Sequence, residues 1–205
     1  MYFRRFILGA IASVPMLAVL AGTAHALSPN AAKSFITQSG QKLVAIVNGA
    51  DSQGQKASQL RDLVNQIVAV DQVGDYVLGR YINVATPAQK QQFQALFHQL
   101  LSYNITYQIK AYQGVTFTVN SATPQGDDVL VDTTVTAPEK SPADVGWVVE
   151  DEAGQPKIID VIVAGTSLRI TTRNDYAGVI TDNGGQVSAL LNAMQNQISK
   201  IAAAQ

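Results

Sequence analysis

The sequence contains no cysteine, which excludes disulfides, thiolate metal sites and a cysteine nucleophile. Histidine is also scarce: outside the first 26 residues only His98 remains, and the sequence shows no partner that would orient it as a general base. Charged residues make up 14% of the chain, whereas 47% of it is hydrophobic. A protein with so few charges must bury its apolar side chains against itself or against a ligand.

Motifs of catalysis and cofactor binding are missing as well. There is no glycine-rich phosphate loop, no G-x-S-x-G elbow and no H-E-x-x-H helix. The acidic stretches 127–128 and 150–152 lack the spacing of a calcium loop and the ligand set of a transition metal. We therefore predict no catalytic residue, no metal and no cofactor.

Two aspartates keep an enzymatic alternative open. Asp132 and Asp160 lie inside predicted strands between apolar neighbours, and Ile158 and Ile162 are expected on the face of Asp160. A buried aspartate in a cone-shaped α+β fold can serve as a general base. The other interpretation, which we favour, is a salt bridge or hydrogen bond to an arginine of a helix.

The amino terminus has the three parts of a secretory signal peptide. Arg4 and Arg5 precede an apolar run over 6–20, and the segment ends in the small-residue site Ala24-His25-Ala26. The apolar run is shorter than the roughly 20 residues of a membrane-spanning helix. We predict that residues 1–26 are cleaved after export by the Sec or the twin-arginine route, leaving a periplasmic protein.

The remaining residues, 27–205, have the size of a single domain. Both charges of the signal are arginines, so the mature chain is two units more negative than the formal net charge of −1 of the whole sequence. A negative protein without basic runs is not expected to bind nucleic acid.

Hydrophobic periodicity predicts helices at both ends of the mature chain. Thr86, Pro87 and Gln89 form a capping box with proline at the first helical position, which starts the longest helix. Its apolar stripe includes Ile105 and Ile109 and continues to about Tyr112. The other helices are expected over 29–48 with a break at Gly40, 60–68, 71–81, 166–182 and 186–203.

Between these helices the period changes to two, which is typical of strands. Alternation around 115–119, 129–135, 145–149 and 159–163, with turns between, predicts a four-stranded antiparallel meander. We therefore expect an α+β fold with helices packed on a curved sheet that wraps around the longest helix. One face of the sheet would carry Val129, Val131, Val145, Trp147, Val149, Ile159, Val161 and Val163. Alternation does not distinguish a filled core from a ligand cavity.

Several segments, in order, resemble the MlaC and toluene-tolerance family of periplasmic phospholipid-binding proteins. They run Leu78-Gly79-Arg80-Tyr81, Ala85 to Gln89, Gln92-Phe93, Lys157 to Val161 and Gly165 to Leu168, followed by Arg173 and Tyr176. The stretch 173–191 is similar to the hopanoid-associated HpnM branch of that family. The chain departs from the family at Ile82 and Pro156, where aromatic residues are usual.

The resemblance implies an MlaC-like fold, similar to the nuclear-transport-factor cone, with an apolar cavity for acyl chains. It also implies a monomeric carrier, not an enzyme, that shuttles phospholipid between an outer-membrane lipoprotein complex and an inner-membrane MCE-type ABC transporter. A hopanoid or related polycyclic lipid is the alternative cargo. A chaperone-like module that uses the apolar surface to bind proteins is a further alternative.

The lipid-binding residues that we predict combine the sheet face, the long helix and the joint that precedes it, with Tyr76, Val77 and Tyr81 near the mouth. Arg80 has two interpretations, an ion pair that stabilises the helix joint or a contact to the lipid headgroup. The predicted set is Val73, Tyr76, Val77, Tyr81, Phe93, Phe97, Leu100, Leu101, Trp147, Val149, Ile159, Val161 and Val163.

Overall fold

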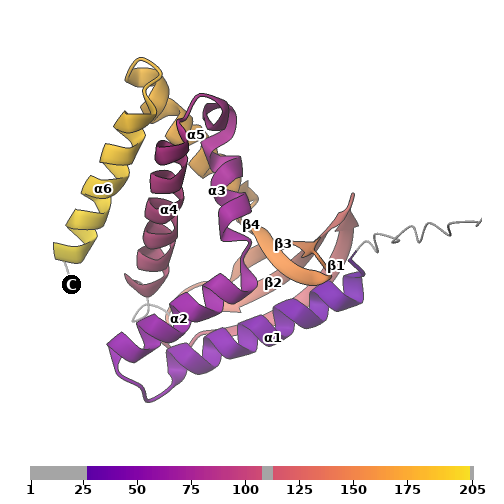
Figure 1. Cartoon of the computed structure of the whole chain (residues 1–205). Helices are drawn as coiled ribbons and strands as arrows, with labels where there is room; N and C mark the ends of the chain where they lie inside the picture. Colours follow the sequence, from indigo (N-terminus) through magenta and orange to yellow (C-terminus); the bar gives the residue numbers. More distant parts are fainter. Residues whose placement is uncertain (1–26, 108–112, 204–205) are drawn as a thin grey trace, which may run out of the picture.

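The computed structural model of the chain describes residues 27–107 and 113–203 (Figure 1). The predicted signal segment 1–26 lies outside the described residues. The same holds for Ile109 and Tyr112, where the longest helix was expected to end.

Six α-helices and a short 3-10 helix are present in the described part of the chain, in an α+β arrangement as predicted. Helix α4 starts at the predicted capping box, because the Gln89 amide donates to Thr86 Oγ1 (3.2 Å) and the Thr86 amide donates to Gln89 Oε1 (3.0 Å). The helices are α1 (Pro29–Asn48), α2 (Gln53–Ile67), α3 (Val70–Leu78), η1 (Gly79–Asn83), α4 (Pro87–Tyr107), α5 (Leu168–Asp182) and α6 (Val187–Ala203).

Helix α1 passes through Gly40 without a break, contrary to the sequence-based expectation. A Cβ atom at Gly40 would lie 2.1 Å from the ring of Phe117, so the glycine provides the space into which this strand residue packs. The residue that weakens the helical pattern in the sequence is therefore a packing position between helix and sheet.

The sheet is an antiparallel meander in the order β1-β2-β3-β4-β5. Its strands are β1 (Thr116–Gln125), β2 (Asp128–Thr136), β3 (Ala143–Glu152), β4 (Gln155–Val163) and β5 (Thr166–Ser167). The four predicted strands are present, and the fifth occupies two residues that were expected to begin a helix. Ala164 (φ 49°) and Gly165 (φ 79°) form a tight turn that folds these residues back onto β4. Helix α5 consequently begins at Leu168.

A β-bulge in β4 changes which side chains face the interior. Val148 pairs with Asp160 and Val149 pairs with Ile158, so Ile159 has no partner in the register. Ile159 packs with Val148 on the opposite face. The prediction that Ile159 shares a face with Val161 is therefore wrong, and so is the placement of Ile158 on the face of Asp160.

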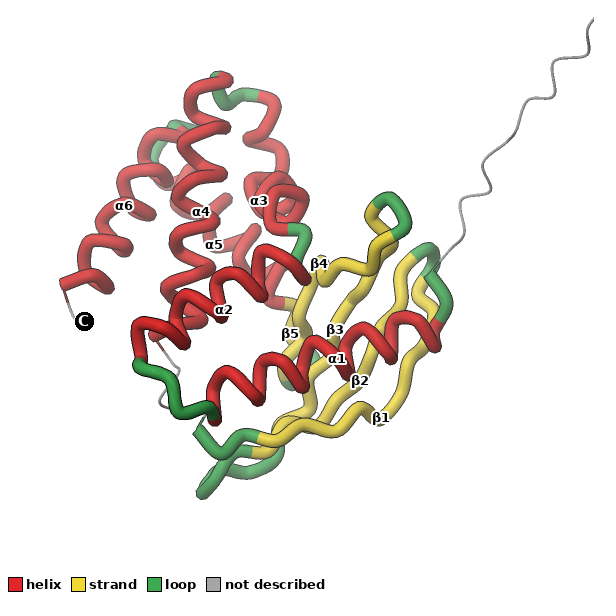
Figure 2. The backbone as a smooth tube through the Cα atoms, turned by 60° about the horizontal axis from the view of Figure 1, so that its bottom comes forward, coloured by secondary structure: helices red, strands yellow, loops and turns green. Residues whose placement is uncertain are grey.

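The helices divide into two groups. Helix α1 crosses one face of the sheet and contacts β1, β2 and β4, whereas α4 contacts α6, α2 and α3 (Figures 1 and 2). The expectation that the sheet wraps around the longest helix is therefore wrong. The apolar stripe of α4 packs against other helices, and helix α1 covers the sheet.

The contact between Gly40 and Phe117 leads to a stability prediction. Gly40→Ala must displace the Phe117 ring, and overpacking of this kind costs about 1–3 kcal/mol, more than the gain of up to about 1 kcal/mol in helix propensity. The matched control is Gly178→Ala in α5, where no atom lies within 4 Å of the added methyl group. It should raise the free energy of unfolding by about 0.5–1 kcal/mol. Urea denaturation followed by the fluorescence of Trp147, the single tryptophan, measures both changes. Equal shifts of the two variants would contradict the packing role of Gly40.

Candidate functional site

The apolar interior contains two main clusters. The sheet cluster lies between α1 and the inner sheet face, and its buried members are Ala32, Ile36, Val129, Val131, Val149 and Ile158. The helix cluster lies among α2 to α6 and η1, and its buried members are Val64, Val70, Val77, Leu78, Tyr81, Ala85, Phe93, Leu96, Phe97, Leu100, Ile180, Val187, Leu190, Leu191, Met194 and Ile198.

The predicted site residues are divided between these clusters. Val149 is buried in the sheet cluster, and Trp147 and Val161 pack against it. Val163, at the end of β4, is 37% exposed. Ile159 lies on the opposite face of the sheet, buried with Val148 and Ala69. The other predicted residues belong to the helix cluster, either buried (Val77, Tyr81, Phe93, Phe97, Leu100) or packed against it (Val73, Tyr76, Leu101). The structure therefore does not bring the sheet face and the long helix into one cluster.

The sequence interpretation missed the residues of α1 that cover the sheet. Ala32 and Ile36 are buried in the sheet cluster, and Phe35 packs against it. The spacing of Ala32 and Ile36, four residues apart, marks one face of a helix and was the available signal. Nothing in that spacing says that the sheet is what it contacts.

The large side chains of the sheet cluster remain only half-buried. Phe35, Phe117 and Trp147 pack around the buried valines and retain apolar surface that the described part of the chain does not cover. The Trp147 indole is oriented by a hydrogen bond that Nε1 donates to Thr133 Oγ1 (2.9 Å), and the same hydroxyl donates to the carbonyl oxygen of Val145 (2.9 Å). Thr133 is 1% exposed, so the hydrogen bond that fixes the orientation of the indole lies in the buried interior.

The segment between α2 and α3 connects the two clusters. Val68 packs against both of them, and it forms an isolated parallel bridge with Ile158 of β4. The amide of Ala69 donates to the carbonyl oxygen of Ile158 (3.1 Å). The boundary between the helices and the sheet is therefore stabilised by backbone pairing at this point.

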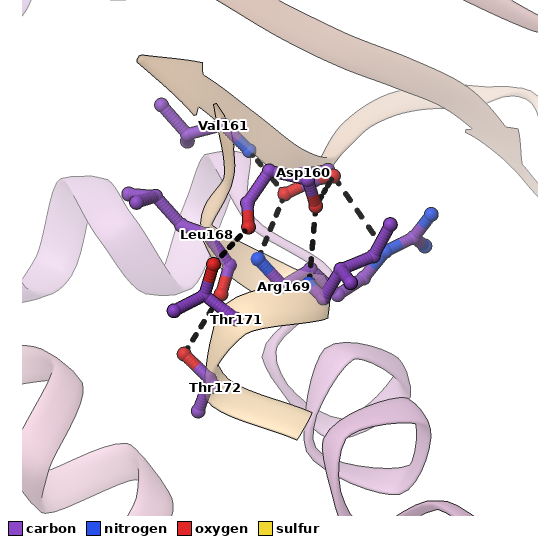
Figure 3. Close-up of polar contacts among 8 residues, drawn as sticks. Asp160, Val161, Leu168, Arg169, Thr171 and Thr172 are labelled. Atoms are coloured by element: carbon purple, nitrogen blue, oxygen red, sulfur yellow. Dashed lines mark hydrogen bonds and ion pairs between the residues drawn. The ribbon is translucent and has the colours of Figure 1, made fainter. Parts of the chain in front are cut away.

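The aspartate considered as a possible base is fully engaged in structural contacts (Figure 3). Asp160 is 7% exposed and accepts hydrogen bonds from Ser167 Oγ (2.5 Å), the Arg169 amide (3.0 Å) and the Val161 amide (2.8 Å). Arg169 Nε lies 3.9 Å from its Oδ2 atom. The carboxylate thus caps the start of α5, where negative charge also compensates the helix dipole. This is the contact to a helix arginine that we favoured. Asp132 accepts a hydrogen bond from Ser121 Oγ (2.7 Å).

Two arginines of α5 approach the ring of Tyr76 in α3. The guanidinium carbons of Arg169 and Arg173 lie 4.2 Å and 5.0 Å from the ring centroid, within the range of cation–π attraction. Gly79 permits this arrangement, because a Cβ atom there would lie 2.9 Å from Arg173 Nε and the residue has a φ of 57°. Tyr76 is therefore part of the α3–α5 contact.

Arg80 and Tyr81 form a polar contact between η1 and α5. Arg80 Nη2 donates to the Tyr81 hydroxyl (2.9 Å), which lies 2.8 Å from Thr181 Oγ1. The hydrogen bonds to Thr181 and Arg80 lower the pKa of the Tyr81 hydroxyl. By contrast, burial raises the pKa of Tyr176, whose ring packs edge-on against Phe93, to about 12. Within the described residues Arg80 has no ion pair, so that interpretation of it is wrong.

Two surface hollows adjoin the helix cluster. One of about 470 Å³ is lined by Arg80, Tyr81, Val84, Thr181 and Gly185. The other, of about 380 Å³, lies between α2 and α4 and is lined by Arg61, Asn65, Ala95, His98, Gln99, Ser102 and Tyr103. His98, for which the sequence showed no partner, has one in the structure. Its Nε2 atom lies 2.8 Å from Asp71 Oδ1.

Across the described ranges, no group of three or more potential metal-ligating side chains occurs. Within the same ranges, every helix is too short or too polar to cross a bilayer.

Comparisons with known proteins agree with one another. Residues 37–196 match the family model of the MlaC protein. Among solved structures, the chain is similar to the phospholipid-binding protein from Ralstonia solanacearum, which was solved in complex with a phospholipid. The TM-score is 0.74 at 25% sequence identity, and the match covers 83% of this chain and 98% of the other.

The contacts of Asp160 predict a loss of stability when its charge is removed. Asp160→Asn keeps the shape of the side chain but weakens a buried, charge-assisted set of hydrogen bonds, which should lower the free energy of unfolding by about 1–3 kcal/mol. Asp127→Asn at the exposed β1–β2 turn is the control and should change it by less than about 0.5 kcal/mol. Chemical denaturation measures both, and an unchanged stability of the Asp160 variant would contradict the capping role.

Proposed function

The chain belongs to the MlaC protein family, and from this premise we propose that it is a periplasmic lipid carrier that binds the acyl chains of a phospholipid in its apolar interior. The observation that carries this proposal is the likeness of nearly the whole described fold to a protein solved with a phospholipid bound. The matched region includes the sheet and most of the helices, since the family match begins within α1 and ends within α6.

The acyl chains are proposed to bind along the sheet cluster. Its half-buried Phe35, Trp147 and Val161 retain apolar surface that a ligand can cover, whereas Phe93 and Val77 of the helix cluster are already almost completely buried. In this proposal the sheet side of the predicted set contacts lipid directly. The helix side forms the wall behind it, with Val68 at the boundary.

The physical need for a carrier follows from the cost of exposing lipid to water. Each acyl methylene kept out of water contributes about 0.8 kcal/mol, so a diacyl lipid does not cross an aqueous compartment unaided at a useful rate. We propose that residues 1–26 direct the protein to the periplasm and that it moves lipid between an outer-membrane complex and an inner-membrane ABC transporter.

A carrier accounts for the structure better than an enzyme that uses Asp160. A general base must have a free acceptor position within reach of a substrate proton. Both carboxylate oxygens of Asp160 already accept hydrogen bonds from neighbouring groups of the chain. We therefore interpret this aspartate as structural.

The cargo can be identified by native mass spectrometry of the protein purified from the periplasm, followed by organic extraction. We expect one diacyl phospholipid per chain. A polycyclic triterpenoid would instead assign the hopanoid cargo. A lipid-free protein that also fails to take up lipid from vesicles would overturn the carrier proposal and favour a protein-binding role.

A charged residue in the sheet cluster should abolish lipid binding. Val161→Glu places a carboxylate beside Trp147, where acyl chains cannot solvate it, and should reduce the lipid that co-purifies by at least about tenfold. The control Thr118→Glu adds the same charge at an exposed position of β1 and should retain the lipid. Circular dichroism verifies that both variants fold. A folded Val161 variant with its full lipid content would refute this placement of the acyl chains.

A further inference from the structure

The groove between α2 and α4 is lined mainly by hydrogen-bond donors. Arg61 and Asn65 contribute from α2, and His98, Gln99 and Ser102 contribute from α4. The two helices are in contact along this line, and the groove measures about 380 Å³. It is therefore a polar site on the surface of a chain whose interior is predominantly apolar.

Four of these side chains are without partners in the described part of the chain. Arg61, Asn65, Gln99 and Ser102 make no side-chain hydrogen bond or ion pair there. Other cations of the helical layer are engaged differently, since Arg80 donates to Tyr81 and Arg169 lies over Tyr76 beside Asp160. The guanidinium and amide groups of the groove are thus available to an external acceptor.

Carboxylates are nearly absent from the wall of the groove. Among the described residues, the carboxylate of Asp71 touches a lining side chain, since it lies 2.8 Å from Nε2 of His98. The same aspartate is held on the α3 side, where Gln94 Nε2 donates to its carbonyl oxygen (3.0 Å) and to Asp75 Oδ1 (2.7 Å). A guanidinium with neutral donors around it is the arrangement that recognises a phosphate ester.

Resting on the proposed function, we infer that the α2–α4 groove binds the phosphate ester of the lipid headgroup, with Arg61 as its charged contact. Apolar residues continue from the groove along α2, because Val64 belongs to the helix cluster and Ile67 and Val68 pack against the sheet cluster. Val68, the C-cap of α2, follows Arg61 by seven positions, which corresponds to a rise of about 10 Å. A phospholipid can span this distance with its headgroup at Arg61 and its acyl chains at the sheet cluster.

The test compares the uptake of two lipids that differ only in the headgroup. Full-length mature protein is loaded from vesicles that contain dioleoyl phosphatidylglycerol or dioleoylglycerol, and the affinity for each is measured. Arg61→Gln should weaken phosphatidylglycerol binding by about tenfold or more and leave dioleoylglycerol binding unchanged, because one charge-assisted contact is lost. The control Lys90→Gln removes one charge from an exposed position of α4 outside the groove and should change neither affinity.

A second variant offsets the positive charge of the groove without touching Arg61. Gln99→Glu introduces a carboxylate at the site and should weaken phosphatidylglycerol binding in the same selective way. Loss of affinity for both lipids alike, or for neither, would overturn the headgroup assignment while the carrier function stands. Failure of the unmodified protein to bind either lipid would instead overturn the carrier function.

A soluble phosphate ester is the other source of the same chemistry. Titration with glycerol 3-phosphate, followed by the side-chain amide signals of Asn65 and Gln99 in NMR spectra, measures it directly. In one outcome, Arg61→Gln weakens saturable binding of glycerol 3-phosphate but leaves the affinities for both lipids unchanged. This result would assign the groove to a soluble ester and overturn the headgroup role. If glycerol 3-phosphate competes weakly with phosphatidylglycerol and does not compete with dioleoylglycerol, the result supports the headgroup role.

Discussion

Strand β4 is the element on which the arrangement of the whole molecule depends. The segment between α2 and α3 pairs with it through Val68, Ala69 and Ile158, and Lys157 Nζ donates to the carbonyl oxygen of Gln66 (2.6 Å) at the end of α2. Farther along the strand, Asp160 caps α5. The contacts that hold helices α2, α3 and α5 to the sheet thus converge within four residues of one strand. The position of the helical layer relative to the sheet follows from them.

The bulge at Ile159 makes these contacts compatible. Without the extra residue, strict alternation would place Ile158 and Asp160 on one face, so that either the apolar contact to Val149 or the cap of α5 would be lost. With the bulge, Ile158 joins the sheet cluster and Asp160 faces the helices. A single inserted residue therefore allows one strand to serve an apolar interior and a polar anchor at the same time.

The fold combines a well-packed helical layer with an incompletely covered apolar face. The helix cluster has a fully buried centre at Phe93, which is stacked on Phe97 and in edge contact with Tyr176. The sheet cluster has half-buried aromatic side chains at its margin. Polar recognition is separate from both and lies at the surface between α2 and α4. In the proposed function, the affinity for acyl chains and the selectivity for the headgroup therefore arise in different parts of the fold.

The sequence by itself determined the elements whose signals are local. The capping box at Thr86, the four longer strands and the α+β class follow from spacing and side-chain chemistry within a few residues of each other. Only the tertiary structure decided that α1 and not α4 covers the sheet, that Ile159 is bulged, and that Arg61 and Gln99 line one groove. Periodicity shows which side of an element is apolar, but it contains no information about which partner covers that side. Partner choice depends on the packing of residues far apart in the sequence, and one inserted strand residue inverts the alternation on which a local interpretation relies.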